Sequence, residues 1–195
     1  MMRQTLINRE TKETKIAINL NLDGTGNFEG SSGIGFFDHM LNSFAVHSGF
    51  DIVVSSKGDL HVDCHHTVED IGIVLGTAFN DVLVDKCGIK RYGNAVIPMD
   101  ESLATATVDI SGRPFLVFNT EFSENMIGTF NTCMVKEFFK AFAFNAGITL
   151  HINLNYGENA HHQVEAVFKA VAHSLKQAVC PLEDDDSILS TKGIL

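Results

Sequence analysis

The chain lacks the features that mark membrane, secreted and nucleic-acid-binding proteins. No apolar run reaches the roughly 18 residues that a membrane span needs, and the opening stretch MMRQTLINRETKETK has no apolar signal core. Lysine and arginine number 14 against 24 acidic residues, and the net charge is −10, which argues against a nucleic-acid or anionic membrane surface. We therefore expect a cytoplasmic protein whose partners include neither nucleic acid nor membrane.

Cysteine is also scarce. The four cysteines lie far apart and form no CxxC pair, so in a reducing compartment we expect free thiols with packing roles. Histidine is more informative, because an unusual phrase of two adjacent histidines occurs twice. HHTVEDIG begins at His65, and HHQVEAVF begins at His161, in the second half of the chain.

The order of predicted elements repeats as well. In each half a strand is followed by a second strand, a helix that stops at a glycine, a strand and a second helix. The predicted ranges are 15–24, 27–33, 36–49, 50–58 and 67–86 in the first half, and 101–111, 113–122, 129–147, 148–157 and 161–179 in the second. Each half therefore reads ββαβα, with both helices on one face of a sheet.

This repetition predicts an α+β fold made of internally duplicated ββαβα units, in a two-layer sandwich. We expect the first unit to span residues 1–95 and the second to span 96–182. We expect residues 183–195 to form a C-terminal substrate-binding arm. The acidic stretch PLEDDDS, residues 181–187, links the second unit to the terminal STKGIL, which we expect to become ordered on binding.

The repeated phrase predicts metal binding. Positions i and i+4 lie on one face of a helix, so His65 with Glu69, and His161 with Glu165, can each chelate a cation. The adjacent residues His66 and His162 point about 100° away. We expect them to serve a different ion, so that two repeats imply at least two metals.

The duplication locates two further candidate ligands. Gly49 and Gly147 both end the first helix of their half, and counting ten residues back from each gives His39 and Glu137. Imidazole and carboxylate ligands without thiolate favour Mn²⁺ or Fe²⁺ over structural Zn²⁺.

The few basic residues suggest an anion site. Arg91 lies in KRYGNA and Arg113 in SGRPF, while the chain ends on STKGIL. Arginine beside glycine-flanked backbone and a Ser/Thr-x-Lys tail are suited to holding a phosphate. The candidate anion ligands are Arg91, Arg113, Ser190, Thr191 and Lys192.

Several motifs together resemble the imidazoleglycerol-phosphate dehydratase family of histidine biosynthesis. They are FFDHML, HHTVED, MDESL, DISGRP, EFF, HHQVEAVFKA and STKGIL, and they span nearly the whole chain in order. The form resembled is the monofunctional one. The resemblance implies a duplicated fold like the second domain of ribosomal protein S5, assembled into a 24-subunit shell with sites where subunits meet.

The resemblance also implies the reaction and the residues. The family's enzymes are hydro-lyases that convert D-erythro-1-(imidazol-4-yl)glycerol 3-phosphate to 3-(imidazol-4-yl)-2-oxopropyl phosphate, with two Mn²⁺ ions per site. The implied metal ligands are His39, His65, His66, Glu69, His161, His162 and Glu165, with Glu137 where many members have histidine. The implied substrate contacts are Glu13, His39, His47, Arg91, Arg113, Lys169, Ser190, Thr191 and Lys192.

The expected chemistry is metal-assisted dehydration. A metal on an imidazole nitrogen would help the ring push electrons toward a departing hydroxyl, while carboxylates move protons. The resemblance assigns acid/base roles to Glu13 and, beside its ligand role, to Glu165. Two alternatives stay open on the residues alone: a dinuclear metal hydrolase acting on phosphate esters, and a metal-storing shell, which would not need an anion site.

Overall fold

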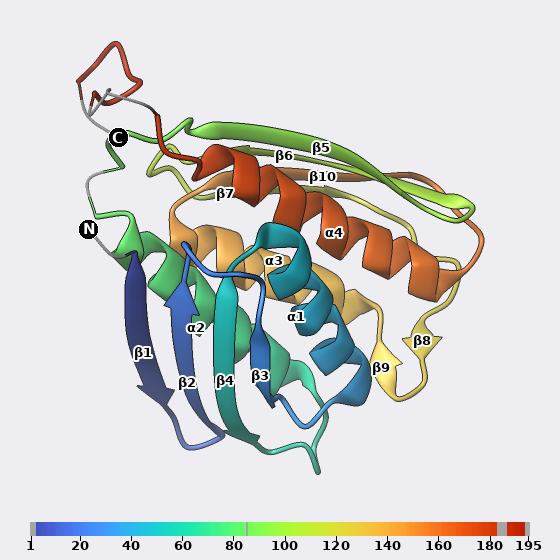
Figure 1. Cartoon of the computed structure of the whole chain (residues 1–195). Helices are drawn as coiled ribbons and strands as arrows, with labels where there is room; N and C mark the ends of the chain where they lie inside the picture. Colours follow the sequence, from blue (N-terminus) through green and yellow to red (C-terminus); the bar gives the residue numbers. More distant parts are fainter. Residues whose placement is uncertain (1–2, 85, 183–186, 194–195) are drawn as a thin grey trace.

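A computed structural model of the chain describes residues 3–84, 86–182 and 187–193. The first half forms a four-stranded sheet covered on one face by two helices (Figure 1). Side chains alternate between the two faces of a strand, and this explains which face the helices cover. In the strand Thr14–Asn21, Ile16, Ile18 and Leu20 are buried, while the residues between them are not. The elements are β1 (Gln4–Glu10), β2 (Thr14–Asn21), β3 (Phe28–Ser31), α1 (Gly35–Ser48), β4 (Asp51–Gly58) and α2 (His65–Val82).

The second half repeats this arrangement. The first sheet has the order β1-β2-β4-β3 and the second has the order β5-β6-β10-β7. In each sheet one edge pair is parallel, β3 with β4 and β7 with β10, and the other pairs are antiparallel. The elements are β5 (Tyr92–Met99), β6 (Ser102–Asp109), β7 (Phe115–Asn119), β8 (Met126–Ile127), β9 (Phe130–Asn131), α3 (Cys133–Ala146), β10 (Thr149–Tyr156) and α4 (Ala160–Ala178).

The α+β class and the duplicated ββαβα order are confirmed. Each half also has a strand at its start that the sequence did not predict, β1 in the first half and β5 in the second. β5 runs from Tyr92 to Met99 and so crosses the predicted unit boundary between 95 and 96. The short β8–β9 ribbon was not predicted either, and α2 begins at His65 rather than at residue 67.

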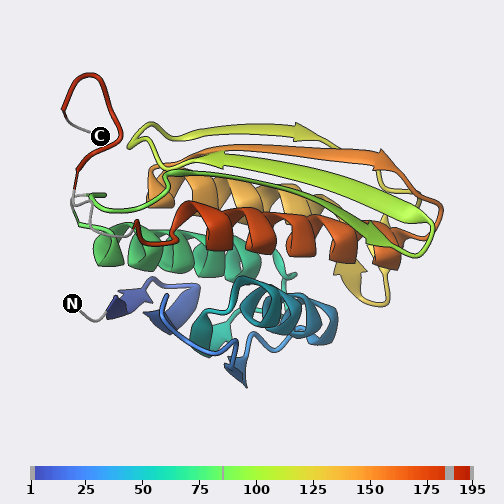
Figure 2. The ribbon, with the colours of Figure 1, turned by 45° about the horizontal axis from the view of Figure 1, so that its top comes forward.

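The two halves stack through their helices. The sheets lie on the outside, and the helices lie between them (Figures 1 and 2). α2 packs on α3 and α1 packs on α4. The core joins both halves, since the Phe138 ring lies 5.2 Å from that of Phe37 and 5.5 Å from that of Phe168. No helix of the described residues is long and apolar enough to cross a bilayer.

Two glycines allow α2 and α3 to touch along their backbones. A Cβ at Gly72 would lie 2.7 Å from the carbonyl oxygen of Phe138, and one at Gly76 would lie 2.5 Å from that of Phe142. Only glycine permits such an approach. The residue numbers rise together along this contact, so the two helices are parallel and their N-terminal ends lie at the same end of the molecule.

Candidate active site

The two histidine pairs stand in the first turn of α2 and of α4, and a polar side chain caps each turn. Asp63 Oδ1 accepts the backbone N–H of His65 at 2.7 Å, and Asn159 Oδ1 accepts that of His161 at 2.9 Å. Asn159 is the N-cap residue of α4, whereas Asp63 stands one residue before the N-cap of α2, Cys64. Both acceptors satisfy N–H groups that have no partner within the helix. An Asp or Asn two residues before each HH is visible in the sequence, but neither residue was among those predicted.

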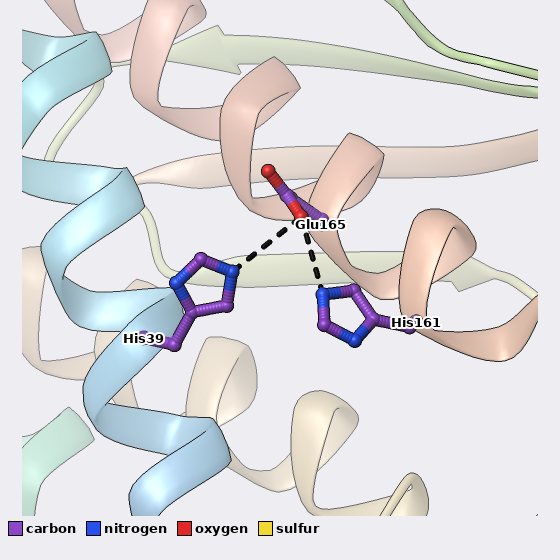
Figure 3. Close-up of side chains that lie close together, drawn as sticks. All are labelled: His39, His161 and Glu165. Carbon is purple, nitrogen blue, oxygen red and sulfur yellow. Dashed lines mark ion pairs between the residues drawn. The ribbon is translucent and has the colours of Figure 1, made fainter.

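One metal-capable cluster joins α1 to α4, and we call His39, His161 and Glu165 the α1–α4 site (Figure 3). Glu165 Oε2 lies 3.6 Å from His39 Nε2 and 3.4 Å from His161 Nε2. Two ligands at roughly 2.1 Å from a divalent ion lie about 3.0–3.5 Å apart. The three residues therefore fit a single ion with little movement.

Glu165 is held in its charged form. It is buried at 8% exposure, and burial opposes ionisation, but the hydrogen bond and charge of Lys169 outweigh this and lower the pKa of the Glu165 carboxyl. Lys169 Nζ contacts Oε1 at 2.8 Å. This leaves Oε2 facing His39 and His161, as a ligand oxygen must.

The duplicated counterpart is less complete, and we call His65, Glu69 and Glu137 the α2–α3 site. His65 Nε2 lies 3.7 Å from Glu69 Oε2. Among the described residues the α1–α4 site alone brings three ligand atoms within 4.8 Å of one another, so Glu137 does not close a cluster here. A cavity beside His65 is lined by Cys64 and Cys133, both free thiols.

The second histidine of each pair is oriented by a carboxylate. Asp59 Oδ2 lies 3.0 Å from Nδ1 of His66, and Glu101 Oε2 lies 2.7 Å from Nδ1 of His162. These hydrogen bonds raise the pKa of both imidazoles, and the bond from His162 lowers the pKa of Glu101. A carboxylate on Nδ1 fixes the ring and leaves Nε2 to bind a metal.

Glu13 reaches the first histidine pair from the turn between β1 and β2. Its Oε2 lies 3.7 Å from Nδ1 of His66, and its side chain is 57% exposed. The structure therefore brings the predicted acid/base residue to the predicted ligands. Nothing in the local sequence of TKETK distinguishes this glutamate, because the contact depends on packing of the hairpin against α2.

His47, a predicted substrate contact, faces α4. Its Nδ1 lies 3.1 Å from Nε2 of His173. Burial lowers the pKa of both rings, and the positive charges of Lys169 and Lys176 lower them further. His47 lies two turns of α1 beyond His39.

The predicted anion ligands gather around one cavity of about 810 Å³. Arg91 forms a two-point contact with Asp109, at 2.7 and 3.1 Å, which raises the pKa of Arg91, and it also donates to the carbonyl oxygen of Leu189. The Arg113 side chain is 68% exposed. The lining includes Arg91, Arg113, Ser190, Thr191 and Lys192. Within the predicted arm, residues 183–186 and 194–195 lie outside the described residues.

This cavity and the α1–α4 site lie at opposite ends of α4. The backbone N–H of Arg91 donates to the carbonyl oxygen of Ala178 at 2.9 Å, at the last residue of the helix. Glu165 lies in the second turn, so the helix separates the two by about 20 Å at its usual rise per residue. Figure 1 shows residues 187–193 beyond the C-terminal end of α4.

Proteins of one class of hydro-lyases are similar to this chain in structure and in sequence. A crystal structure of imidazoleglycerol-phosphate dehydratase from Staphylococcus aureus is similar at a TM-score of 0.83 and 41% identity, covering 93% of this chain and 99% of that one. The structure of the Pyrococcus furiosus protein in complex with (S)-C348 has the same TM-score at 36% identity, covering 97% and 100%.

The sequence profile of the family described as imidazoleglycerol-phosphate dehydratase matches residues 32–175. The proteins of that name from Azorhizobium caulinodans and Ruegeria pomeroyi are 56% and 52% identical to this chain, and both alignments cover all of it and 99% and 100% of the relatives. The chain belongs to the imidazoleglycerol-phosphate dehydratase family. It is an enzyme of histidine biosynthesis that removes water from its substrate.

Proposed function

We propose that the protein is an Mn²⁺-dependent lyase that converts D-erythro-1-(imidazol-4-yl)glycerol 3-phosphate to 3-(imidazol-4-yl)-2-oxopropyl phosphate. The α1–α4 site is the observation that carries the metal dependence. It holds two imidazoles and one carboxylate, and no thiolate. Such a donor set suits Mn²⁺ or Fe²⁺.

Each site would hold two ions, one at each histidine pair. His39, His161 and Glu165 would hold one chelated ion, and His65 with Glu69 would provide the corresponding pair in the other half. The outward nitrogens of His66 and His162 are proposed to complete the coordination, and Glu137 is proposed to do so at the α2–α3 site. When bound, each ion would supply a Lewis acid that polarises the imidazole and orients the hydroxyls of the substrate.

The protein's own residues would move the proton and hold the phosphate. The carbon that loses a proton has no carbonyl beside it, so a base must stand close to it. Glu13 is exposed beside His66 and is proposed for this role. Glu165, kept ionised by Lys169, is the second carboxylate able to exchange a proton. Loss of that proton and of hydroxide from the carbon beside the imidazole, together one water, would leave an enol. The enol would become the ketone of the product by losing its hydroxyl proton and taking up a proton at the carbon beside the imidazole.

The phosphate would be bound in the cavity at the arm. Arg91 holds Leu189 of the arm. The Arg113 guanidinium lies 3.7 Å from Asp109 Oδ2 but is 68% exposed, so it is proposed to turn its outer face to the dianion. Lys169 and His47 would contact the substrate nearer the α1–α4 site.

We also propose that each site is completed by another copy of the chain, in a 24-subunit assembly. The distance of about 20 Å between the phosphate cavity and the α1–α4 site exceeds what one small substrate can bridge. A second copy that presents its arm to the α1–α4 site would resolve this mismatch. The particle mass of the purified protein tests the subunit number.

The direct experiment incubates the purified protein and Mn²⁺ with imidazoleglycerol phosphate. The proposal expects the oxo-phosphate product without release of inorganic phosphate. Arg113→Ala provides the test of the anion cavity, and it should raise KM strongly while metal content stays the same. Release of inorganic phosphate from simple phosphate esters, with no dehydration, would instead identify a metal-dependent hydrolase.

A further inference from the structure

A buried carboxylate ties α2 to the β1–β2 hairpin. Asp70 is 8% exposed, although it lies in the same helical turn as the exposed ligand residues. Its Oδ2 accepts the hydroxyl of Thr14, and its Oδ1 accepts Nε of Arg9 at 2.9 Å. Arg9 lies near the end of β1 and Thr14 begins β2. The two contacts therefore hold both sides of one tight turn.

The turn between these contacts carries Glu13. The Thr11 hydroxyl oxygen accepts the backbone N–H of Glu13 at 3.1 Å and that of Thr14 at 3.0 Å. The backbone N–H of Thr11 donates to the carbonyl oxygen of Thr14 at 2.9 Å. The backbone at Glu13 is thus fixed by Thr11 and Thr14, and the position of its carboxylate beside His66 depends on where the turn sits on α2.

The second half fixes its corresponding carboxylate by a different route. Glu101 immediately precedes Ser102 at the start of β6, just as Glu13 immediately precedes Thr14 at the start of β2. Glu101 bonds to His162 itself, and its other oxygen accepts the backbone N–H of Asn159 at 2.9 Å. The residue that corresponds to Asp70 in the second HHxxE phrase is Ala166.

We propose that Asp70 is a positioning residue which, through Thr14 and Arg9, sets the place of the Glu13 carboxylate at the first histidine pair. The inference rests on the role proposed for Glu13. Hydrogen bonds to an ionised acceptor are stronger than neutral ones, so a buried carboxylate can hold the turn while Glu13 stays exposed to substrate. A misplacement of about 1 Å in an active site can cost on the order of 100-fold in rate.

The test uses Thr14, because it belongs to no ligand phrase and lies on a different element from the metal residues. Thr14→Val removes the hydroxyl, while Thr14→Ser keeps it. We expect Thr14→Val to lower kcat by about 10- to 100-fold with metal content and KM unchanged, and Thr14→Ser to restore kcat to near the starting value. Thr105→Val, which removes a hydroxyl bonded to exposed Asn155, is the matched control and should leave kcat unchanged.

The decisive readout is the combination with Glu13→Gln. If Thr14 acts through Glu13, Thr14→Val lowers kcat less than about twofold once Glu13 is already Gln, because coupled residues are not additive. An equal loss in both backgrounds, or no loss in either, overturns the inference while leaving the dehydratase intact. Absence of dehydration in the unaltered protein would overturn the proposed function and this inference together.

Discussion

The two halves of the molecule present the same helix starts but different ligand clusters. Asp63 and Asn159 cap equivalent turns, and each places a histidine pair and a glutamate one turn apart. On α4, Glu165 lies within 3.6 Å of both His39 and His161, and it forms an ion pair with Lys169. On α2 the glutamate meets His65 alone in this structure.

The difference shows which parts of a duplicated site are free to diverge. The caps and the chelating pairs lie within one helix, so each half keeps them as a local unit. The third candidate ligand comes from a facing helix, and there the halves differ: α1 brings His39 to its cluster, whereas Glu137 of α3 does not close one with His65 and Glu69 among the described residues. The carboxylates beside His66 and His162 also come from different positions, Asp59 after β4 and Glu101 before β6.

The largest effect is expected from the central carboxylate of the α1–α4 site. Glu165→Gln removes the charge that both imidazoles and Lys169 contact, so we expect kcat to fall by 100-fold or more and about one ion per site to be lost. Glu69→Gln is the matched change in the α2–α3 site. Metal analysis and the dehydration assay should show a larger loss for Glu165→Gln; equal losses would mean that the two sites are equivalent in the assembled enzyme.

Removing the carboxylates that orient His162 and His66 should weaken metal binding, with a smaller effect than Glu165→Gln. Glu101→Gln and Asp59→Asn each leave the histidine in place but release its ring, and we expect metal affinity to fall by about 10- to 100-fold. The shorter contact of Glu101, at 2.7 Å against 3.0 Å, predicts the greater loss for Glu101→Gln. Titration of each metal-depleted variant with Mn²⁺ measures its metal affinity. An unchanged affinity in either variant would show that the carboxylate replaced there does not support metal binding.

Glu137→His tests whether the third ligand explains the difference between the halves. The substitution gives α3 the residue type that α1 has at its matched position. We expect the α2–α3 site to bind an ion more tightly, by up to about tenfold, and to shift in preference from Mn²⁺ toward Zn²⁺, because imidazole favours the softer ion. Competition between the two ions, followed by metal analysis, provides the measurement, and no change in preference would show that residue 137 is not a ligand.

The sequence predicted the elements that depend on local patterns better than those that depend on contacts between distant parts of the chain. Helices and their glycine stops were predicted because their periodicity is local. β1 was missed because it is an edge strand with mostly exposed side chains, so it shows no buried alternation. β5 contains Pro98 and Gly93, which argue against a strand; Gly93 is needed because a Cβ there would lie 1.9 Å from the carbonyl oxygen of Ser174 on α4.

The site was predicted to a similar extent. Both chelating pairs were identified from spacing alone, and His39 was identified from the duplication. The grouping of His39 with His161 and Glu165 was not predicted, because it depends on the packing of α1 on α4. Asp59, Asp70 and Glu101 were not identified. Asp70 and Glu101 contact partners distant in sequence, and Asp59, seven residues before His66, lies in a loop outside the repeated phrase. A lone Asp or Glu carries no local sign of such a contact. The roles proposed for Glu13 and Lys169 likewise depended on the resemblance to the family.

The smallest expected effect concerns the His47–His173 contact, which has no chelating role. Burial holds the pKa of both rings below the ordinary value of about 6.5, so the folded state favours the neutral pair. Its contribution to stability is complete above pH 6.5 and is lost as the pH falls below that value toward the lowered pKa, because the unfolded chain then binds more protons.

His173→Asn should therefore reduce the fall in thermal midpoint between pH 7.5 and pH 5.5 by a few degrees at most. His151→Asn, on the exposed face of β10, is the matched control and should leave the fall unchanged. An equal pH dependence in the unaltered protein and in His173→Asn would show that the pair does not titrate on unfolding.

We propose that the two histidine-rich helix starts hold the ions that make dehydration possible. The most direct measurement removes metal with a chelator, confirms its absence by metal analysis, and follows turnover of imidazoleglycerol phosphate before and after Mn²⁺ is restored. We predict that turnover disappears with the metal and returns as about two ions per chain are bound. A metal-free protein that turned over substrate at the full rate would contradict the account.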